Sequence, residues 1–290
     1  MSSHSHLHAM PQLSFSGALR SELTRFVSLR STWVFLGITA VLFPIGAAFL
    51  SAVMRFASTI GPDGKPATTP AAIPGTVYWQ SITTTGGTCA VLFAIFAALA
   101  LTAEYSNSSI QTVFVANPRR MSVFWSKAIV AAALSMVASL VGIFVAWAVV
   151  AIVLAPAKLS PMENWQNSRM ILMTFLGVAL SMAAFAAMGV GIAALIRSTA
   201  LSILAIFGLT YVLPLGISIL ASVGTNLSWL ESVDSVMPTE AYSAFLRAGI
   251  EAYGSPGWVP DWWQAGLILA AWAVALSVAG SFVMRKVDIK

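Results

Sequence analysis

The side chains that could do chemistry in this sequence are few and scattered. His4, His6 and His8 have the alternating spacing of a metal-binding tract. Nothing near them fixes their geometry, so we interpret residues 1–14 as a flexible polar tail. The nearest approach to a phosphate-binding loop, residues 61–65, lacks the required spacing, and no H-E-x-x-H or G-x-S-x-G motif occurs.

Acids and thiols offer no better case for catalysis. Glu231, Asp234 and Glu240 are the only candidates for a catalytic acid cluster, and their spacing is typical of solvated loop charges. The single cysteine, Cys89, excludes a disulfide framework and a multi-cysteine metal site. We therefore predict that the chain is not an enzyme by itself and holds neither a metal ion nor a cofactor.

The elements that carry these residues belong to a membrane. Hydrophobic residues make up 58% of the 290 residues and charged residues 9%, against roughly 45–50% and about 25% in soluble domains. So few charges cannot cover a soluble globule. The sequence therefore predicts an integral membrane protein without a nucleic-acid partner, and the net charge of +5 reflects topology instead.

Long intervals without charge predict the membrane-spanning segments. A spanning helix needs roughly 20 mostly apolar residues, and six intervals contain one such stretch each. Period-2 alternation is absent, so helices are expected and the fold class is all-α. Only Arg197-Ser198-Thr199 separates the fourth span from the fifth, which requires a hairpin there. The expected spans within the transmembrane domain, residues 31–290, are 33–53, 84–103, 128–154, 170–196, 201–223 and 263–284.

The distribution of Lys and Arg sets the expected orientation. Placing both termini on one side puts ten basic residues there and five on the other. The positive-inside rule then predicts cytoplasmic N- and C-termini. The ten are Arg20, Arg25, Arg30, Arg119, Arg120, Lys127, Arg197, Arg285, Lys286 and Lys290, and the five are Arg55, Lys65, Lys158, Arg169 and Arg247.

Two amphipathic helices are expected outside the spans. Residues 15–30 carry apolar side chains at helical spacing, which predicts a cytoplasmic helix in the membrane interface. Glu22 falls within its apolar arc, so it either reaches out at the helix edge or pairs with a basic group on a neighbouring element. Tyr242, Phe245 and Leu246 predict an outer re-entrant or interfacial helix before the last span.

Within the spans, the polar groups are hydroxyls and small residues. Thr83, Thr84, Thr85 and Thr88 crowd the outer end of the second span. They form either a helix-packing face, which membrane proteins favour, or the wall of a largely apolar substrate path. Gly189 and Gly191 in the fourth span, and Gly208 and Gly216 in the fifth, have the same two interpretations, with packing favoured.

The ordered pattern resembles the permease subunits of bacterial ABC-2-type ATP-binding-cassette transporters. A basic amphipathic helix precedes six spans, and a long outer loop with a short helix precedes the last one. The most specific element runs from Glu104-Tyr105 through Asn117-Pro118-Arg119-Arg120 to Lys127. The family's basic or glycine residues after Glu-Tyr are replaced here by residues 106–109, Ser-Asn-Ser-Ser.

The resemblance implies a half-transporter in a prokaryotic plasma membrane. Its partners would be separate cytoplasmic ABC ATPase subunits, which hold ATP and Mg, and a second permease subunit, identical or not. Residues 104–115 would form the coupling helix, and residues 15–30 the connecting helix, whose Glu22 could pair with Arg119 or Arg120. The implied coupling residues are Glu104, Tyr105, Ile110, Val113, Phe114, Arg119 and Arg120, and the implied substrate path contains Thr84, Thr85, Thr88, Tyr211 and Ser218.

The expected function is export of an apolar or amphiphilic substrate, driven by the partner ATPase. A proton-coupled pump is disfavoured because the spans carry no charge apart from Glu104 at the end of the second. Two alternatives remain: a membrane enzyme or assembly factor without an ATPase, and a secondary transporter. The latter would need paired repeats with broken helices, and no convincing internal repeat is visible.

Overall fold

The computed structural model describes residues 14–61, 63–106, 120–223, 228–249 and 258–286. Throughout these residues the regular structure is helical, apart from two isolated β-bridges, Ile60–Pro66 and Ile73–Leu159. The α-helices are α1 (Phe15–Ser28), α2 (Arg30–Ser58), α3 (Gly75–Thr83), α4 (Gly86–Ser106), α6 (Arg120–Leu154), α7 (Asn164–Leu172), α8 (Val178–Ile196), α9 (Thr199–Phe207), α10 (Leu213–Val223), α11 (Ser228–Asp234), α12 (Pro238–Leu246) and α13 (Trp262–Lys286), and the π-helical segments are η1 (Met173–Gly177) and η2 (Gly208–Val212).

Six of the helical segments are long and apolar enough to cross a membrane, which confirms the predicted number of spans and the multi-pass, all-α class. The hairpin between the fourth and fifth spans is also confirmed, because α8 ends at Ile196 and Arg197 adopts a left-handed φ of 57°. The six segments are Arg30–Ser58, Gly75–Tyr105, Met121–Leu154, Asn164–Ile196, Thr199–Ser222 and Trp262–Arg285.

Several helices extend beyond the charge-free intervals that predicted them. The third begins at Arg120 instead of residue 128, and so includes Lys127. It can do so because Lys127 is buried in ion pairs, which removes the cost of an isolated charge. The fourth span begins at Asn164 instead of residue 170.

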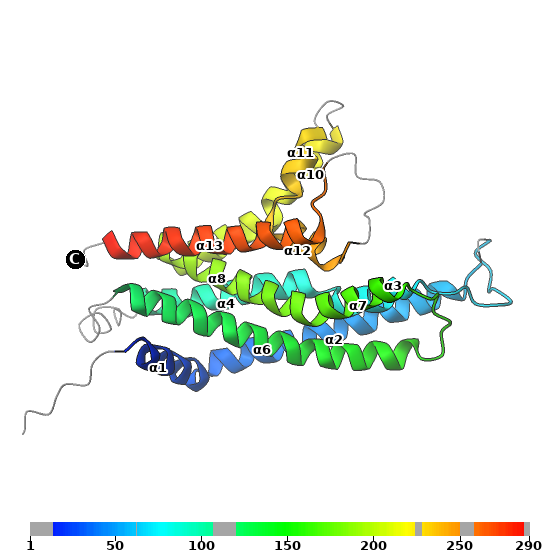
Figure 1. The fold of residues 1–290 in the computed structure, drawn as a ribbon, viewed down its shortest axis with the longest axis horizontal. Helices are drawn as coiled ribbons and strands as arrows, with labels where there is room; N and C mark the ends of the chain where they lie inside the picture. The colour runs from blue at the N-terminus through cyan, green and yellow to red at the C-terminus, as the bar shows by residue number, and fades with distance from the viewer. Residues whose placement is uncertain (1–13, 62, 107–119, 224–227, 250–257, 287–290) are drawn as a thin grey trace, which may run out of the picture.

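The spans pack along one another in a bundle whose two ends differ (Figure 1). The first end holds α1, the C-terminal end of α4 and the start of α6, and we call it the α1 end. The second holds α3 and α7, and we call it the α3 end. Figure 1 also shows α10 and α11 projecting away from the other helices.

The core of the bundle is formed by the second and fourth spans. In their most apolar windows 61% and 56% of the residues are buried, against 17% in the fifth span. Small residues permit this close packing: a Cβ at Gly189 would lie 2.0 Å from the Ala94 carbonyl oxygen, and one at Gly191 2.5 Å from the Leu276 backbone. The packing interpretation is therefore confirmed for these two glycines, whereas a Cβ on Gly208 or Gly216 would meet nothing within 4 Å.

Candidate functional site

Two features of the bundle stand out as candidate functional sites. One is a cluster of buried charges at the α1 end, and the other is a hydroxyl-lined cavity between the α3 end and α12. They share one helix, α4, which contributes Glu104 to the first and Thr88 to the second.

The charge cluster joins three helices that are far apart in sequence. Lys127 Nζ of α6 donates to Glu22 Oε2 of α1 at 2.8 Å and to Glu104 Oε1 of α4 at 2.7 Å. Arg25 Nη1, also on α1, donates to Glu104 Oε1. The Glu104 side chain is 0% exposed and the Lys127 side chain 1%, whereas Arg25 is 39% exposed. We call these four residues the ion cluster.

The ion cluster balances its charges at the boundary of the apolar core. Two cations face two carboxylates, so the formal charges sum to zero. Lys127 Nζ also lies 5.6 Å from the centroid of the Phe26 ring, which further stabilises the ammonium group. Removing one member would leave a buried charge uncompensated, which typically costs about 3–5 kcal/mol. The cluster therefore holds α1 firmly against α4 and α6.

The local sequence explains why α1 can present these groups. Ser14 caps the helix by accepting from the Gly17 backbone N–H at 3.1 Å, and the chain becomes extended at Leu29. Glu22 and Phe26, four residues apart, lie on the same helix face, and both are buried. Of the two alternatives for Glu22, the structure has the ion pair, with Lys127 as the partner.

The other implied coupling residues are only partly described. Tyr105 lies at the end of α4 and packs half-buried against the core. Ile110, Val113, Phe114 and Arg119 lie outside the described residues, as do His4, His6 and His8, and only the backbone of Arg120 is described. Sequence reasoning missed Arg25 and Lys127 as partners of the acids. The available signal was that charges near the ends of apolar spans need a counter-charge.

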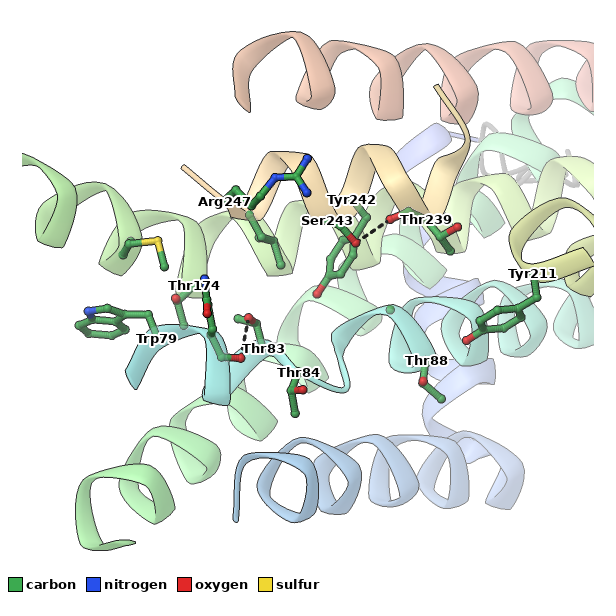
Figure 2. Close-up of a pocket in the computed structure, with 14 residues that line it drawn as sticks. Trp79, Thr83, Thr84, Thr88, Thr174, Tyr211, Thr239, Tyr242, Ser243 and Arg247 are labelled. Atoms are coloured by element: carbon green, nitrogen blue, oxygen red, sulfur yellow. Dashed lines mark hydrogen bonds between the residues drawn. The ribbon is translucent and has the colours of Figure 1, made fainter. Parts of the chain in front are cut away.

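The second candidate site is a cavity of about 360 Å³ (Figure 2). Hydroxyl groups and aromatic rings dominate its lining, and Arg247 is the one charged residue among the lining residues. Such a surface can bind a ligand through hydrogen bonds and ring contacts. The lining residues are Trp79, Gln80, Thr83, Thr84, Gly87, Thr88, Met170, Thr174, Tyr211, Thr239, Tyr242, Ser243, Leu246 and Arg247.

A break in the second span forms one wall of the cavity. The helix is interrupted at residues 84–85, between α3 and α4. Thr85 Oγ1 donates to the Leu42 carbonyl of α2 at 3.1 Å. This contact is close because Gly46 has no side chain: a Cβ there would lie 2.2 Å from Thr85 Cγ2. Thr85 therefore serves the packing between α2 and the break.

A proline positions the opposite wall. Pro214 lacks an N–H, so the carbonyl of Thr210 four residues earlier loses its usual helical donor. The preceding residues form η2, and the Thr210 carbonyl accepts from Thr239 Oγ1 of α12 at 2.9 Å. The irregular segment in the fifth span thus attaches α12 at the cavity.

Tyr242 extends from α12 toward the broken span (Figure 2). It is 4% exposed, and its hydroxyl has no hydrogen-bond partner among the described residues. Burial raises the pKa of this hydroxyl, which keeps it protonated. The hydroxyl oxygen is itself buried and lies against Gly86 at the start of α4, where a Cβ would lie 1.8 Å from it.

The cavity brings together three of the five predicted path residues, Thr84, Thr88 and Tyr211. Thr85 contacts α2 instead, and Ser218 is exposed on α10, where it donates to the Leu215 carbonyl. Neither is among the residues that line the cavity. The contribution of α12 was missed, although the apolar spacing around Tyr242 showed that this helix has a buried face.

The acids considered for catalysis do not line the cavity. Burial raises the pKa of Asp234. Burial also raises the pKa of Glu240; the nearby charge of Asp234 raises that pKa further, and the charge of Arg247 lowers it. Among the described residues no group of three or more His, Cys, Asp or Glu could hold a metal ion. No protein-family model and no curated protein matches the chain.

Proposed function

We propose that this chain is the membrane-spanning permease subunit of an ABC-2-type transporter that exports an apolar or amphiphilic substrate. The observation that carries the proposal is the ion cluster, because its Glu104 begins residues 104–115, the stretch that resembles the family's coupling helix. A separate ATPase, holding ATP and Mg, would supply the energy, and this chain would not be an enzyme by itself.

The ion cluster suits the transmission of a push from such a partner. A displacement of residues 107–119 acts directly on the end of α4 and the start of α6. Glu104 and Lys127, close to those two helix ends, are bonded to each other and to α1. Because the cluster is buried and charge-balanced, the three helices would move together instead of sliding past one another.

The charge distribution supports a cytoplasmic α1 end in a prokaryotic plasma membrane. Arg20, Arg30 and Arg197 accompany the ion cluster at this end, as expected from the positive-inside rule. In this orientation α1 would be the interfacial connecting helix, with Phe15, Leu23 and Val27 exposed to the bilayer boundary. The termini would be cytoplasmic, and α12 would be the helix that enters the membrane from the outer side.

The cavity and the exposed surface beside it support two further parts of the proposal, namely the substrate path and a second permease subunit, identical or not. Tyr211 lines the cavity and is also 36% exposed on the fifth span. The same span is the least buried of the six and carries exposed apolar residues such as Leu204 and Leu215. A second subunit seated on this face would bury them and complete the path, and the hydroxyls of Thr84, Thr88 and Tyr211 would bind polar atoms of the substrate.

Coupling to the ATPase is the property to test. We would purify the chain with a candidate ABC ATPase subunit and measure substrate-stimulated ATP hydrolysis in proteoliposomes. Glu104→Gln should lower the stimulation about tenfold or more while the variant still binds the ATPase, because the neutral side chain removes the negative charge that Arg25 and Lys127 face. Lys65→Gln, in an exposed loop at the α3 end, is the matched control. Stimulation that is unchanged in Glu104→Gln would reject the coupling role.

A specific observation favours a secondary transporter as the second candidate. Such transporters bind substrate at broken helices, and the second span is broken at residues 84–85 beside the cavity. The purified chain alone, in liposomes with an imposed ion gradient, distinguishes the two functions. Uptake or release of a fluorescent amphiphile without an ATPase would support the secondary transporter and contradict the proposal.

A further inference from the structure

A second cavity, of about 400 Å³, lies at the α1 end between α1 and α2 on one side and α4 and α9 on the other. The lining of this cavity changes from apolar at its floor to polar at its rim. Its aromatic residues are deep: Phe26 is 2% exposed and Phe96 3%, and their rings meet edge to face at 5.7 Å between centroids. Its polar residues include Arg25, which is half-buried, and Ser31, which is exposed. The cavity thus has an apolar floor and a polar, basic rim.

The rim is surrounded by an excess of positive charge. Among the side chains that the structure describes at the α1 end, the two acids, Glu22 and Glu104, are both engaged in the ion cluster. The six basic residues at this end are Arg20, Arg25, Arg30, Lys127, Arg197 and Arg285. After the ion cluster is neutralised, a net positive charge remains that an anionic group can complement.

Arg25 can bind an anion without leaving the ion cluster. A guanidinium group carries five N–H donors in a fixed plane. The contact with Glu104 is made by Nη1, and the side chain is 39% exposed. The remaining donors suit the oxygens of a phosphate group, whose geometry the guanidinium fork matches.

The neighbouring surface places this rim beside lipid acyl chains. Leu23, Val27 and Trp33 are exposed next to the cavity, and Trp33 Nε1 donates to the Val27 carbonyl at 2.9 Å. An exposed tryptophan among apolar residues is typical of the boundary between headgroups and hydrocarbon. A molecule that enters here from the bilayer can leave its headgroup at the rim while its chain reaches the floor.

From these contacts we infer that the cavity at the α1 end binds an anionic phospholipid. One acyl chain lies against Phe26, Phe35 and Phe96, and the phosphate accepts from Arg25. The bound lipid therefore contacts a member of the ion cluster that joins α1 to α4, and membrane composition affects how firmly α1 is held. The inference rests on the cavity alone and does not require the transport function.

The test is native mass spectrometry of the full chain in detergent, titrated with dioleoyl phosphatidylglycerol and, separately, with dioleoyl phosphatidylcholine. The wild type should bind one phosphatidylglycerol at least tenfold more tightly than phosphatidylcholine. Arg25→Gln should weaken phosphatidylglycerol binding about tenfold, the scale of one hydrogen bond between charged groups. Arg20→Gln removes the same charge from an exposed position outside the cavity, so it should weaken binding less than threefold.

A second pair of variants tests the acyl site without touching the ion cluster. Ala100→Phe fills the cavity and should abolish the one-to-one complex, while Ala133→Phe, on an exposed position of α6, should leave it intact. Ala103→Leu, at an exposed lining position, serves if Ala100→Phe does not fold. If Arg25→Gln and Arg20→Gln lose the same amount of phosphatidylglycerol affinity, the lipid is held only by diffuse electrostatic attraction, and the inference is overturned. Lipid binding that persists in Ala100→Phe would also overturn it.

Discussion

The two ends of this bundle hold polar groups in an apolar surrounding by different means. At the α1 end, Glu104 and Lys127 carry full charges, are almost completely buried, and bind each other at 2.7 Å. Toward the α3 end, most of the polar groups around a space of about 360 Å³ are neutral hydroxyls, and Arg247 is the one charged residue among those that line it. Charges that neutralise one another hold helices together, whereas hydroxyl groups around an open space can bind a ligand. The comparison teaches that the ion cluster is a joint between helices and the cavity is a place to bind.

The largest effect should come from breaking the joint. Lys127→Met leaves Glu22 without its cation in a buried site, so we expect the free energy of unfolding to fall by about 3–5 kcal/mol. Denaturant titration of the chain in detergent micelles measures it. Lys158→Met, at an exposed position, should change the unfolding free energy by less than about 0.5 kcal/mol. Equal losses of unfolding free energy in Lys127→Met and Lys158→Met would show that the ion cluster does not stabilise the α1 end.

Packing at the bundle centre should give the next largest effect. Gly189→Ala places a Cβ 2.0 Å from the Ala94 carbonyl oxygen, and we expect it to cost about 1–3 kcal/mol because α4 and α8 must separate. Gly208→Ala is the matched control, since a Cβ there meets nothing within 4 Å. The control should be neutral or slightly stabilising, because alanine favours helix over glycine. The same denaturant titration applies, and a control that costs as much as Gly189→Ala would contradict the packing role.

A smaller effect should come from the hydrogen bond that attaches α12 at the cavity. Thr239→Val removes the donor to the Thr210 carbonyl, which should cost about 1 kcal/mol. In a Pro214→Ala background the restored backbone N–H can satisfy the same carbonyl. A double-mutant cycle measured by unfolding in detergent should therefore give a coupling energy of about 0.5–1 kcal/mol. Strictly additive costs would show that Pro214 does not create the need for Thr239.

The smallest effect should be a pH dependence of stability that comes from Glu240 on α12. Glu240 has a raised pKa in the folded chain because of burial and of Asp234, so the folded state holds its proton more tightly than the unfolded state does. Stability is then fully present below the ordinary pKa of 4.5 and falls as the pH rises through the folded pKa.

The measurement for this prediction is the melting temperature between pH 4.5 and 7.5. Glu240→Gln should flatten part of the decline, and Glu163→Gln, at an exposed position, controls for the loss of one carboxylate. If the wild type melts at a higher temperature as the pH rises across this window, while Glu240→Gln does not, the sign of the argument is wrong.

Much of the fold could be predicted because the bilayer imposes simple rules. Six apolar stretches predict six spans, and the short interval around Arg197 predicts the hairpin that its left-handed φ confirms. The break at residues 84–85 was not predicted, although four threonines marked the place. Hydropathy cannot detect it, because a span remains apolar whether or not its helix is continuous.

The candidate site was less predictable, because its partners are distant in sequence. Thr84, Thr88 and Tyr211 were expected in a path and do line the cavity, but Thr85 contacts α2 and Ser218 is exposed on α10. Neighbouring residues on a helix face different directions, so spacing alone does not tell which one faces the cavity.

Composition and the order of apolar stretches thus determined by themselves that this chain is a bundle of membrane-spanning helices, since lipid leaves a backbone few other choices. Only the tertiary structure decided that Lys127 bonds Glu22, 105 residues earlier in the chain, and that Tyr242 closes a cavity against the broken second span. The physical reason is that the burial of a charge or a hydroxyl depends on which distant groups share its space, and a linear pattern does not contain that information.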